Sequence, residues 1–167
     1  MSSSPLPPRI VGTTYNLLFV CSGNTCRSPM AEAIARALLY ERGWTHVDVQ
    51  SAGTGAVHGQ AASPEAVDVG REHGIELEHH SSQPLTGDLI AWADLVLAMS
   101  ASHLHVVSEL GGALKMALVT EFVDGAGYGL PVADPFGGDH DSYREAFAQI
   151  EAAVSSLLDR LEPILSP

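Results

Sequence analysis

The residues best suited to chemistry are gathered in one short segment. Cys21 and Arg27 are separated by five residues, and the segment reads Cys21, Ser22, Gly23, Asn24, Thr25, Cys26 and Arg27. A loop of this length can wrap its backbone N–H groups around a tetrahedral anion, with the positive end of a helix behind them. The segment from Ser22 to Arg27 therefore predicts a phosphate-binding loop, in which Gly23 and Asn24 tolerate the positive φ angles that its curvature needs.

Cys21 and Arg27 would add reactivity to this loop. A helix N-terminus and a guanidinium both favour the thiolate form of Cys21, which is its nucleophilic form. The Ser28 hydroxyl can donate a further hydrogen bond to the sulfur, and the planar fork of Arg27 suits two phosphoryl oxygens. The alternative is that both cysteines are apolar fillers and Arg27 is a surface cap. A chance occurrence of the pattern has a probability on the order of 1%.

The loop lies between a predicted strand and a predicted helix. The apolar run Leu17–Val20 precedes it, and a helical pattern begins at Pro29. Further strands are expected at Val47–Gln50, Leu95–Met99 and Met116–Val119, and further helices near 64–73, 86–93, 101–110 and over Ser142–Leu161. This alternation predicts an α/β fold: a single doubly wound domain with a mostly four-stranded parallel sheet, helices on both faces and the phosphate-binding loop after the first strand.

Composition limits the domain count and the partners. The chain has 167 residues, 46% of them hydrophobic, which suits one domain over 15–167 behind a Ser- and Pro-rich leader, 1–14, expected to be flexible. A net charge of -12 argues against nucleic acid and membranes as partners. The apolar run Leu17–Val20 is too short to span a bilayer, which favours a cytoplasmic location. His103 and His105 fall about 200° apart on their predicted helix, so we expect no metal site.

Several segments together resemble the low-molecular-weight protein tyrosine phosphatase family. The resemblance is carried by Leu18–Glu32, Ser51–Gly53, Asp94–Met99 and Ala133–Gly138. It implies that Cys21 is the nucleophile and Asp134 the general acid, which later activates the water that hydrolyses a cysteinyl phosphate without metal or cofactor. Phosphorylated proteins would be the substrates. Without the resemblance, Asp134 before Pro135 would be interpreted as a turn initiator.

The resemblance also implies residues that support the loop. Asn24, Ser28, Ser51 and His79 would form a hydrogen-bonded layer that keeps it curled, although a plain surface histidine is the alternative at position 79. Cys26 either packs in the core or forms a disulfide with Cys21 that protects the thiolate from irreversible oxidation. The sequence favours neither account of Cys26.

Thr25 and Phe136 bear on the phosphorylated residue that is recognised. Tyrosine-directed members carry Ile or Leu where Thr25 stands and have aromatic residues in the flanking loops. Here segment 54–63 contains no Phe, Tyr or Trp, and Asp134-Pro135 is followed by one aromatic residue, Phe136, and then by two glycines. Thr25 with the run Asp134–Gly138 resembles the bacterial protein arginine phosphatase branch, which implies phosphoarginine as the substrate; Phe136 could stack on its guanidinium.

Three other functions are weighed against this one. The nearest is a low-molecular-weight tyrosine phosphatase acting on phosphotyrosine. An arsenate reductase would need a further cysteine pair downstream of Cys26, which the sequence lacks. A non-catalytic anion-binding module would need neither the Cys21 nucleophile nor the Asp134 acid.

Overall fold

Four parallel strands form one sheet in the computed structural model, which describes residues 14–165. The predicted leader lies outside the described residues except for Thr14. The strands are β1 (Tyr15–Cys21), β2 (Val47–Gly53), β3 (Leu95–Ala98) and β4 (Met116–Leu118), in the spatial order β2-β1-β3-β4. The predicted four-stranded parallel sheet is confirmed.

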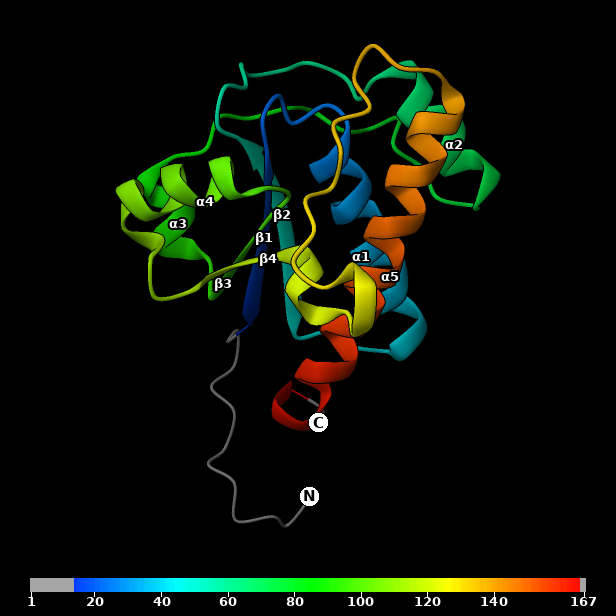
Figure 1. The fold of residues 1–167 in the computed structure, drawn as a ribbon. Helices are drawn as coiled ribbons and strands as arrows, with labels where there is room; N and C mark the ends of the chain where they lie inside the picture. Colours follow the sequence, from blue (N-terminus) through cyan, green and yellow to red (C-terminus); the bar gives the residue numbers. More distant parts are fainter. Residues whose placement is uncertain (1–13, 166–167) are drawn as a thin grey trace.

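Helices cover both faces of this sheet (Figure 1). On one face lie α1 (Arg27–Arg42), α2 (Pro64–Glu72) and α5 (His140–Leu165), with α5 packed against both of the others. On the other face lie α3 (Gly87–Trp92) and α4 (Ala101–Val107). Three shorter helical turns, η1 (Ser108–Gly112), η2 (Val119–Phe122) and η3 (Gly125–Gly127), connect the later elements. The doubly wound arrangement is therefore as predicted.

Strand β1 is buried on both faces, which explains its unbroken apolar run. Leu17 and Phe19 pack into the cluster under α1 and α5, whereas Leu18 and Val20 pack into the smaller cluster under α3 and α4. All four side chains are fully buried. A central parallel strand has no face turned to water, so its sequence is continuously hydrophobic and does not alternate with polar residues.

Element boundaries differ from the predicted ones where backbone chemistry intervenes. Helix α1 begins at Arg27 rather than Pro29, because proline is tolerated in a first turn whose N–H groups have no helical partner. Helix α4 stops at Val107 and passes into the wide turn η1, in which Gly111 has a φ of 100°. Helix α5 continues past Leu161 to Leu165.

The topology brings three loops to one edge of the sheet. Because all strands are parallel, the segments after β1, β2 and β3 leave from the same edge, and β1 lies between β2 and β3. The order reverses between β1 and β3, which is where ligands bind in open α/β sheets. The segment before Pro135 joins them, since the N–H of Val132 donates to the carbonyl of Met99 at 2.9 Å. Within residues 14–165, no helix combines the length and apolarity that crossing a membrane requires.

Candidate active site

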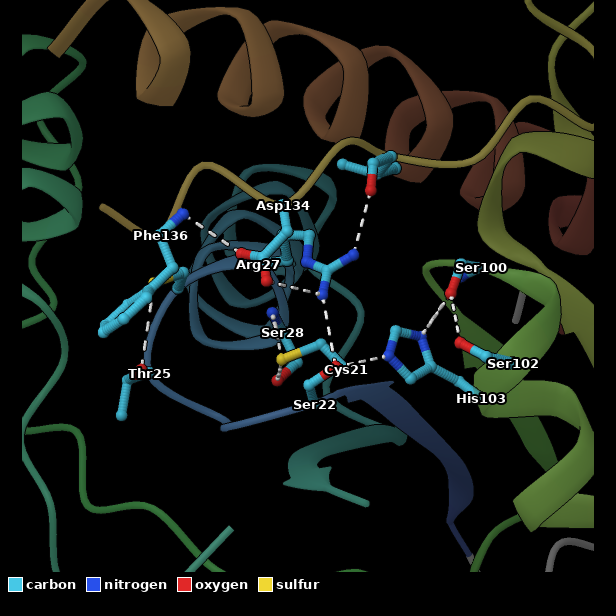
Figure 2. A network of polar contacts seen from close by, with 12 residues as sticks. Cys21, Ser22, Thr25, Arg27, Ser28, Ser100, Ser102, His103, Asp134 and Phe136 are labelled. Carbon is cyan, nitrogen blue, oxygen red and sulfur yellow. Dashed lines mark hydrogen bonds and ion pairs between the residues drawn. The ribbon is translucent and has the colours of Figure 1, made fainter. Parts of the chain in front are cut away.

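The sulfur of Cys21 lies at the buried end of β1 and faces the first turn of α1. Its Sγ is 2.8 Å from Oγ of Ser28 and 3.4 Å from the backbone N of Ser28 (Figure 2). Only 2% of Cys21 is exposed. A backbone N–H can only donate, so the sulfur accepts that bond, as a thiolate does.

Asn24 sets the direction of the hydrogen bond between Ser28 and Cys21. Its Oδ1 accepts from the backbone N–H of Gln83 at 2.9 Å, so its amide nitrogen is the atom that lies 2.8 Å from Oγ of Ser28. The Ser28 oxygen therefore accepts from Asn24, which leaves the Ser28 proton for the sulfur. The hydrogen bonds from the Ser28 hydroxyl and from the Ser28 backbone N–H both favour negative charge on the sulfur of Cys21.

The loop turns at Asn24, which is fully buried and has a φ of 56°. It is the one non-glycine residue with a positive φ in the described part of the chain. Of the two residues that tolerate a positive φ, Asn24 adopts it and Gly23 does not. Hydrogen bonds from the Asn24 side chain hold the left-handed conformation in place, so the neighbouring glycine does not need it.

Ser51 of β2 braces Asn24 from the neighbouring strand. The amide of Asn24 donates to Oγ of Ser51 at 2.9 Å, and Ser51 in turn donates to a carboxylate oxygen of Glu32 at 2.6 Å. Glu32 belongs to α1 and also holds Arg36, one turn later. The structure thus brings Asn24, Ser28 and Ser51 together, with Glu32 as an anchor that the sequence did not suggest.

His80, rather than His79, contacts the loop. Nε2 of His80 lies 2.6 Å from the carbonyl oxygen of Asn24, whereas His79 is exposed and makes no hydrogen bond to the loop within residues 14–165. The expected contact of His79 is therefore corrected to its neighbour. The cause is local: a turn in which the N–H of His80 donates to Leu77 O at 3.2 Å directs the second histidine inward.

Arg27 is 5% exposed and leaves part of its guanidinium without a partner. Nη1 donates to the carbonyl of Val132 at 2.9 Å, and Nη2 lies 3.5 Å from Oγ of Ser22 and 3.6 Å from Oδ2 of Asp134. Nε is buried and has no hydrogen-bond partner within residues 14–165. A buried donor without a partner costs about 1–3 kcal/mol, so this nitrogen suits an anion bound by the loop.

Asp134 faces Arg27 from the segment that follows Val132. Its side chain is 53% exposed, which leaves a carboxyl group accessible to a ligand. Its Oδ1 accepts from the backbone N–H of Phe136 at 3.1 Å, as a turn-initiating aspartate does. The turn and the contact with Arg27 occur together, so the two interpretations of Asp134 are compatible.

Cys26 packs on the far side of the loop from solvent and is a free thiol, as is Cys21. Its Sγ lies 3.4 Å from both Oγ of Ser63 and the hydroxyl of Tyr143. Burial, and next the contact with Cys26, raise the pKa of Tyr143 above its ordinary value. In this structure Cys26 therefore packs in the core as a free thiol. To form a disulfide with Cys21, it would have to leave its contacts with Ser63 and Tyr143.

The surroundings of Thr25 offer few aromatic side chains. Segment 54–63 lies against the loop, since the N–H groups of Thr54, Gly55 and Ser63 donate to Cys21, Ser22 and Thr25 carbonyls, each at 2.9 Å. Segment 54–63 contains no Phe, Tyr or Trp. Thr25 is half-buried, and Phe136, two residues after Asp134, is 72% exposed.

His103 is a site residue that the sequence analysis missed. It is 3% exposed, and Nε2 lies 2.9 Å from Oγ of Ser22 (Figure 2). The sequence pattern bore on it only through the spacing of His103 and His105, which argued against a metal site. Its place one turn into the helix after β3, at the edge where ligands bind, was the available signal.

The chain matches known proteins over nearly its whole length. The family model for low molecular weight phosphotyrosine protein phosphatase matches residues 16–164. A protein-arginine-phosphatase of Bacillus subtilis is 41% identical over 149 residues, which are 88% of this chain and 97% of that protein. A low molecular weight protein-tyrosine-phosphatase of Streptomyces coelicolor is 40% identical and covers 87% of this chain and 92% of its own.

Solved structures agree in fold. The YwlE arginine phosphatase from Geobacillus stearothermophilus superposes with a TM-score of 0.80 at 38% identity, over 90% of this chain and 94% of that one. A YwlE mutant with a phosphorylated active-site serine superposes with a TM-score of 0.81 at 38% identity, over 88% of this chain and 95% of that one. The chain belongs to the low molecular weight phosphotyrosine protein phosphatase family.

Proposed function

We propose that this protein is a cysteine-dependent phosphoprotein phosphatase that hydrolyses phosphoarginine in proteins. One observation supports the chemistry above all others. The buried Nε of Arg27, which has no partner in the described part of the chain, and the hydrogen-bonded sulfur of Cys21 belong to the two ends of one short loop. An oxyanion in that loop would satisfy the guanidinium and present its phosphorus to the sulfur.

In the first step, the Cys21 thiolate attacks phosphorus. The S–P bond forms as the bond from phosphorus to the leaving group breaks, and Asp134 gives its proton to the departing atom. Arg27 and the loop amides hold the phosphoryl oxygens as their charge shifts. The products are the dephosphorylated protein and a cysteinyl phosphate.

In the second step, water removes the phosphoryl group from Cys21. Asp134, now a carboxylate, accepts a proton from water as the water oxygen bonds to phosphorus. The S–P bond breaks, the thiolate is restored and phosphate leaves. Ser28 stabilises the sulfur as a leaving group here and as a nucleophile in the first step.

Phosphoarginine as the substrate is supported by Thr25 and by what surrounds it. An Ile or Leu at position 25 would offer a larger apolar wall to a phenyl ring than a threonine does. Segment 54–63 adds no Phe, Tyr or Trp ring for stacking. Phe136 is exposed and can stack on a planar guanidinium, and the carbonyl oxygen of the protonated Asp134 carboxyl can accept a hydrogen bond from the same group.

A phosphotyrosine phosphatase is the second candidate, favoured by the 40% identity to the Streptomyces coelicolor protein. Release of phosphate from matched phosphoarginine and phosphotyrosine peptides distinguishes the two. We expect kcat/KM to be at least tenfold higher for phosphoarginine. Higher turnover of phosphotyrosine would overturn the substrate proposal, and hydrolysis by the Cys21→Ser variant would overturn the mechanism.

We also propose a cytoplasmic location and phosphorylated proteins as the only macromolecular partners. A reducing compartment keeps thiols such as those of Cys21 and Cys26 free. Fractionation of cells that produce the protein tests the location, and recovery in a secreted fraction would contradict it.

A further inference from the structure

A second line of polar contacts runs from the loop to a buried histidine. Oγ of Ser22 lies 2.9 Å from Nε2 of His103 and 3.5 Å from Nη2 of Arg27 (Figure 2). His103 belongs to α4, which follows β3, whereas Ser22 follows β1. The pairing of β1 with β3 therefore places this histidine beside the loop Ser22–Arg27, 81 positions from Ser22 in sequence.

The backbone of Ser100 identifies which ring nitrogen of His103 carries the proton. The Ser100 N–H lies 3.2 Å from Nδ1 of His103, and a backbone N–H can only donate. Nδ1 is therefore an acceptor, and the neutral ring has its proton on Nε2. Burial, and then the nearby charge of Arg27, lower the pKa of His103 to about 4, against a smaller opposite effect of Asp134. The neutral ring thus donates to Ser22 at neutral pH.

The hydrogen-bonding capacity of Ser22 then becomes decisive. A hydroxyl has two lone pairs and one proton. His103 Nε2–H occupies one lone pair, and Arg27 Nη2 faces the oxygen at the limit of hydrogen bonding. Because His103 and Arg27 both direct N–H groups at the lone pairs of the Ser22 oxygen, the Ser22 proton is free to bond to another acceptor. The place for that acceptor is beside Arg27, where phosphoryl oxygens would be held.

We propose that His103 is a positioning residue for the phosphoryl group: it fixes the Ser22 hydroxyl so that this hydroxyl donates its proton to a phosphoryl oxygen in the loop. The inference rests on the proposed phosphatase function and adds a ligand contact to it. Ser22 touches the substrate, and His103 acts only through Ser22. Helix α4 thereby supports a loop that β1 and α1 otherwise build.

Two substitutions separate this role from the contact that His103 makes with Ser100. An asparagine at position 103 places an acceptor near the position of Nδ1, so it keeps the bond from Ser100 N–H but cannot reach Ser22. A glutamine is long enough to place an N–H near the position of Nε2 and keeps a donor for Ser22. His105, exposed on the same helix and 3.6 Å from Glu109, provides a matched control.

The experiment measures steady-state hydrolysis of p-nitrophenyl phosphate and competitive inhibition by inorganic phosphate, with melting temperatures recorded for every variant. We expect His103→Asn and Ser22→Ala each to lower kcat/KM and to raise the inhibition constant of phosphate by about tenfold. The double variant should lose no more than either single variant, because both remove one interaction. His103→Gln should recover most of the loss, and His105→Asn should match the unchanged protein.

Three results would overturn the inference. The first is a Ser22→Ala variant that phosphate inhibits as strongly as the unchanged protein. The others are a loss of kcat/KM in the double variant that is the product of the two single losses, about a hundredfold, or losses of kcat/KM that are equal in His103→Gln and His103→Asn. Should His103→Asn fail to fold, Ser22→Ala and His103→Gln still decide. Failure of the proposed function is a separate result, since Cys21→Ser would then retain hydrolysis. An inactive Cys21→Ser together with a fully active Ser22→Ala rejects only the role of His103.

Discussion

At the scale of single residues, Asp134 performs two tasks that one substitution can separate. Its Oδ1 holds the turn through Phe136 N–H, while the carboxyl group faces Arg27. Asp134→Asn keeps the acceptor for the turn, but its amide has no acidic proton to give to a leaving group. We expect kcat for phenyl phosphate to fall by about 10²–10³, whereas p-nitrophenyl phosphate, with its stable leaving group, loses much less. Stopped assays with both substrates measure this ratio.

The control for that experiment is Asp124→Asn, since Asp124 is exposed and paired with Arg160 away from the loop. It should leave both rates unchanged. Equal slowing of the two substrates by Asp134→Asn would remove Asp134 as the general acid and leave it with the turn alone.

Thr25 is the residue at which substrate preference should change. Thr25→Ile replaces a hydroxyl by a longer apolar arm in a half-buried position. We expect the ratio of phosphotyrosine to phosphoarginine turnover to rise at least tenfold, because about 1–3 kcal/mol accompanies such a change in an apolar wall. Competition between the two phosphopeptides in one reaction measures the ratio directly. A ratio that does not change denies Thr25 a selecting role.

At the scale of elements, the end of β2 supports the loop by close approach. A Cβ at Gly53 would overlap the carbonyl oxygen of Ser22 and come within 2.9 Å of the backbone N of Asn24. Both neighbours are backbone atoms, which cannot rotate away. Gly53→Ala should therefore lower the free energy of unfolding by about 1–3 kcal/mol and reduce kcat/KM together with it. Urea denaturation and the phosphatase assay report the two effects.

Gly87→Ala is the matched control, because a Cβ there meets no atom within 4 Å at the start of α3. It should leave activity unchanged and raise stability slightly, since alanine favours a helix. If Gly53→Ala kept both stability and activity, the packing of β2 against the loop would have no part in holding its curvature.

Elements were also the scale at which sequence patterns predicted best, and their limits are physical. Alternation of apolar runs with helical periods was enough for the four strands, and it also placed the Cys21 to Arg27 segment at the junction of the first strand and the first helix. Periodicity could not show that α4 gives way after Val107 to the wide turn η1, or that a turn at Leu77 directs His80 inward in place of His79. The contact between His103 and Ser22 depends on strand order, which no local pattern contains.

At the scale of the whole molecule, the buried neutral His103 makes folding depend on pH. Its folded pKa of about 4 lies below the ordinary value of 6.5, so the unfolded chain binds this proton first as the pH falls. The contribution of His103 to the free energy of unfolding is therefore fully present above about pH 6.5 and is lost as the pH falls from there to about 4. The loss from this group amounts to about 2–3 kcal/mol over that range.

The comparison of His103→Asn with the unchanged protein isolates this loss. Urea denaturation at pH 7 and pH 5 should show that the variant loses about 2 kcal/mol less between the two. The lowered pKa values of Glu72, Glu78 and Asp139 act in a different window, below their ordinary values, where falling pH protonates them and removes their stabilising contacts. His105→Asn should keep the full loss, because His105 is exposed. Equal losses in His103→Asn and the unchanged protein would show that burial does not keep the histidine beside the loop neutral as the pH falls.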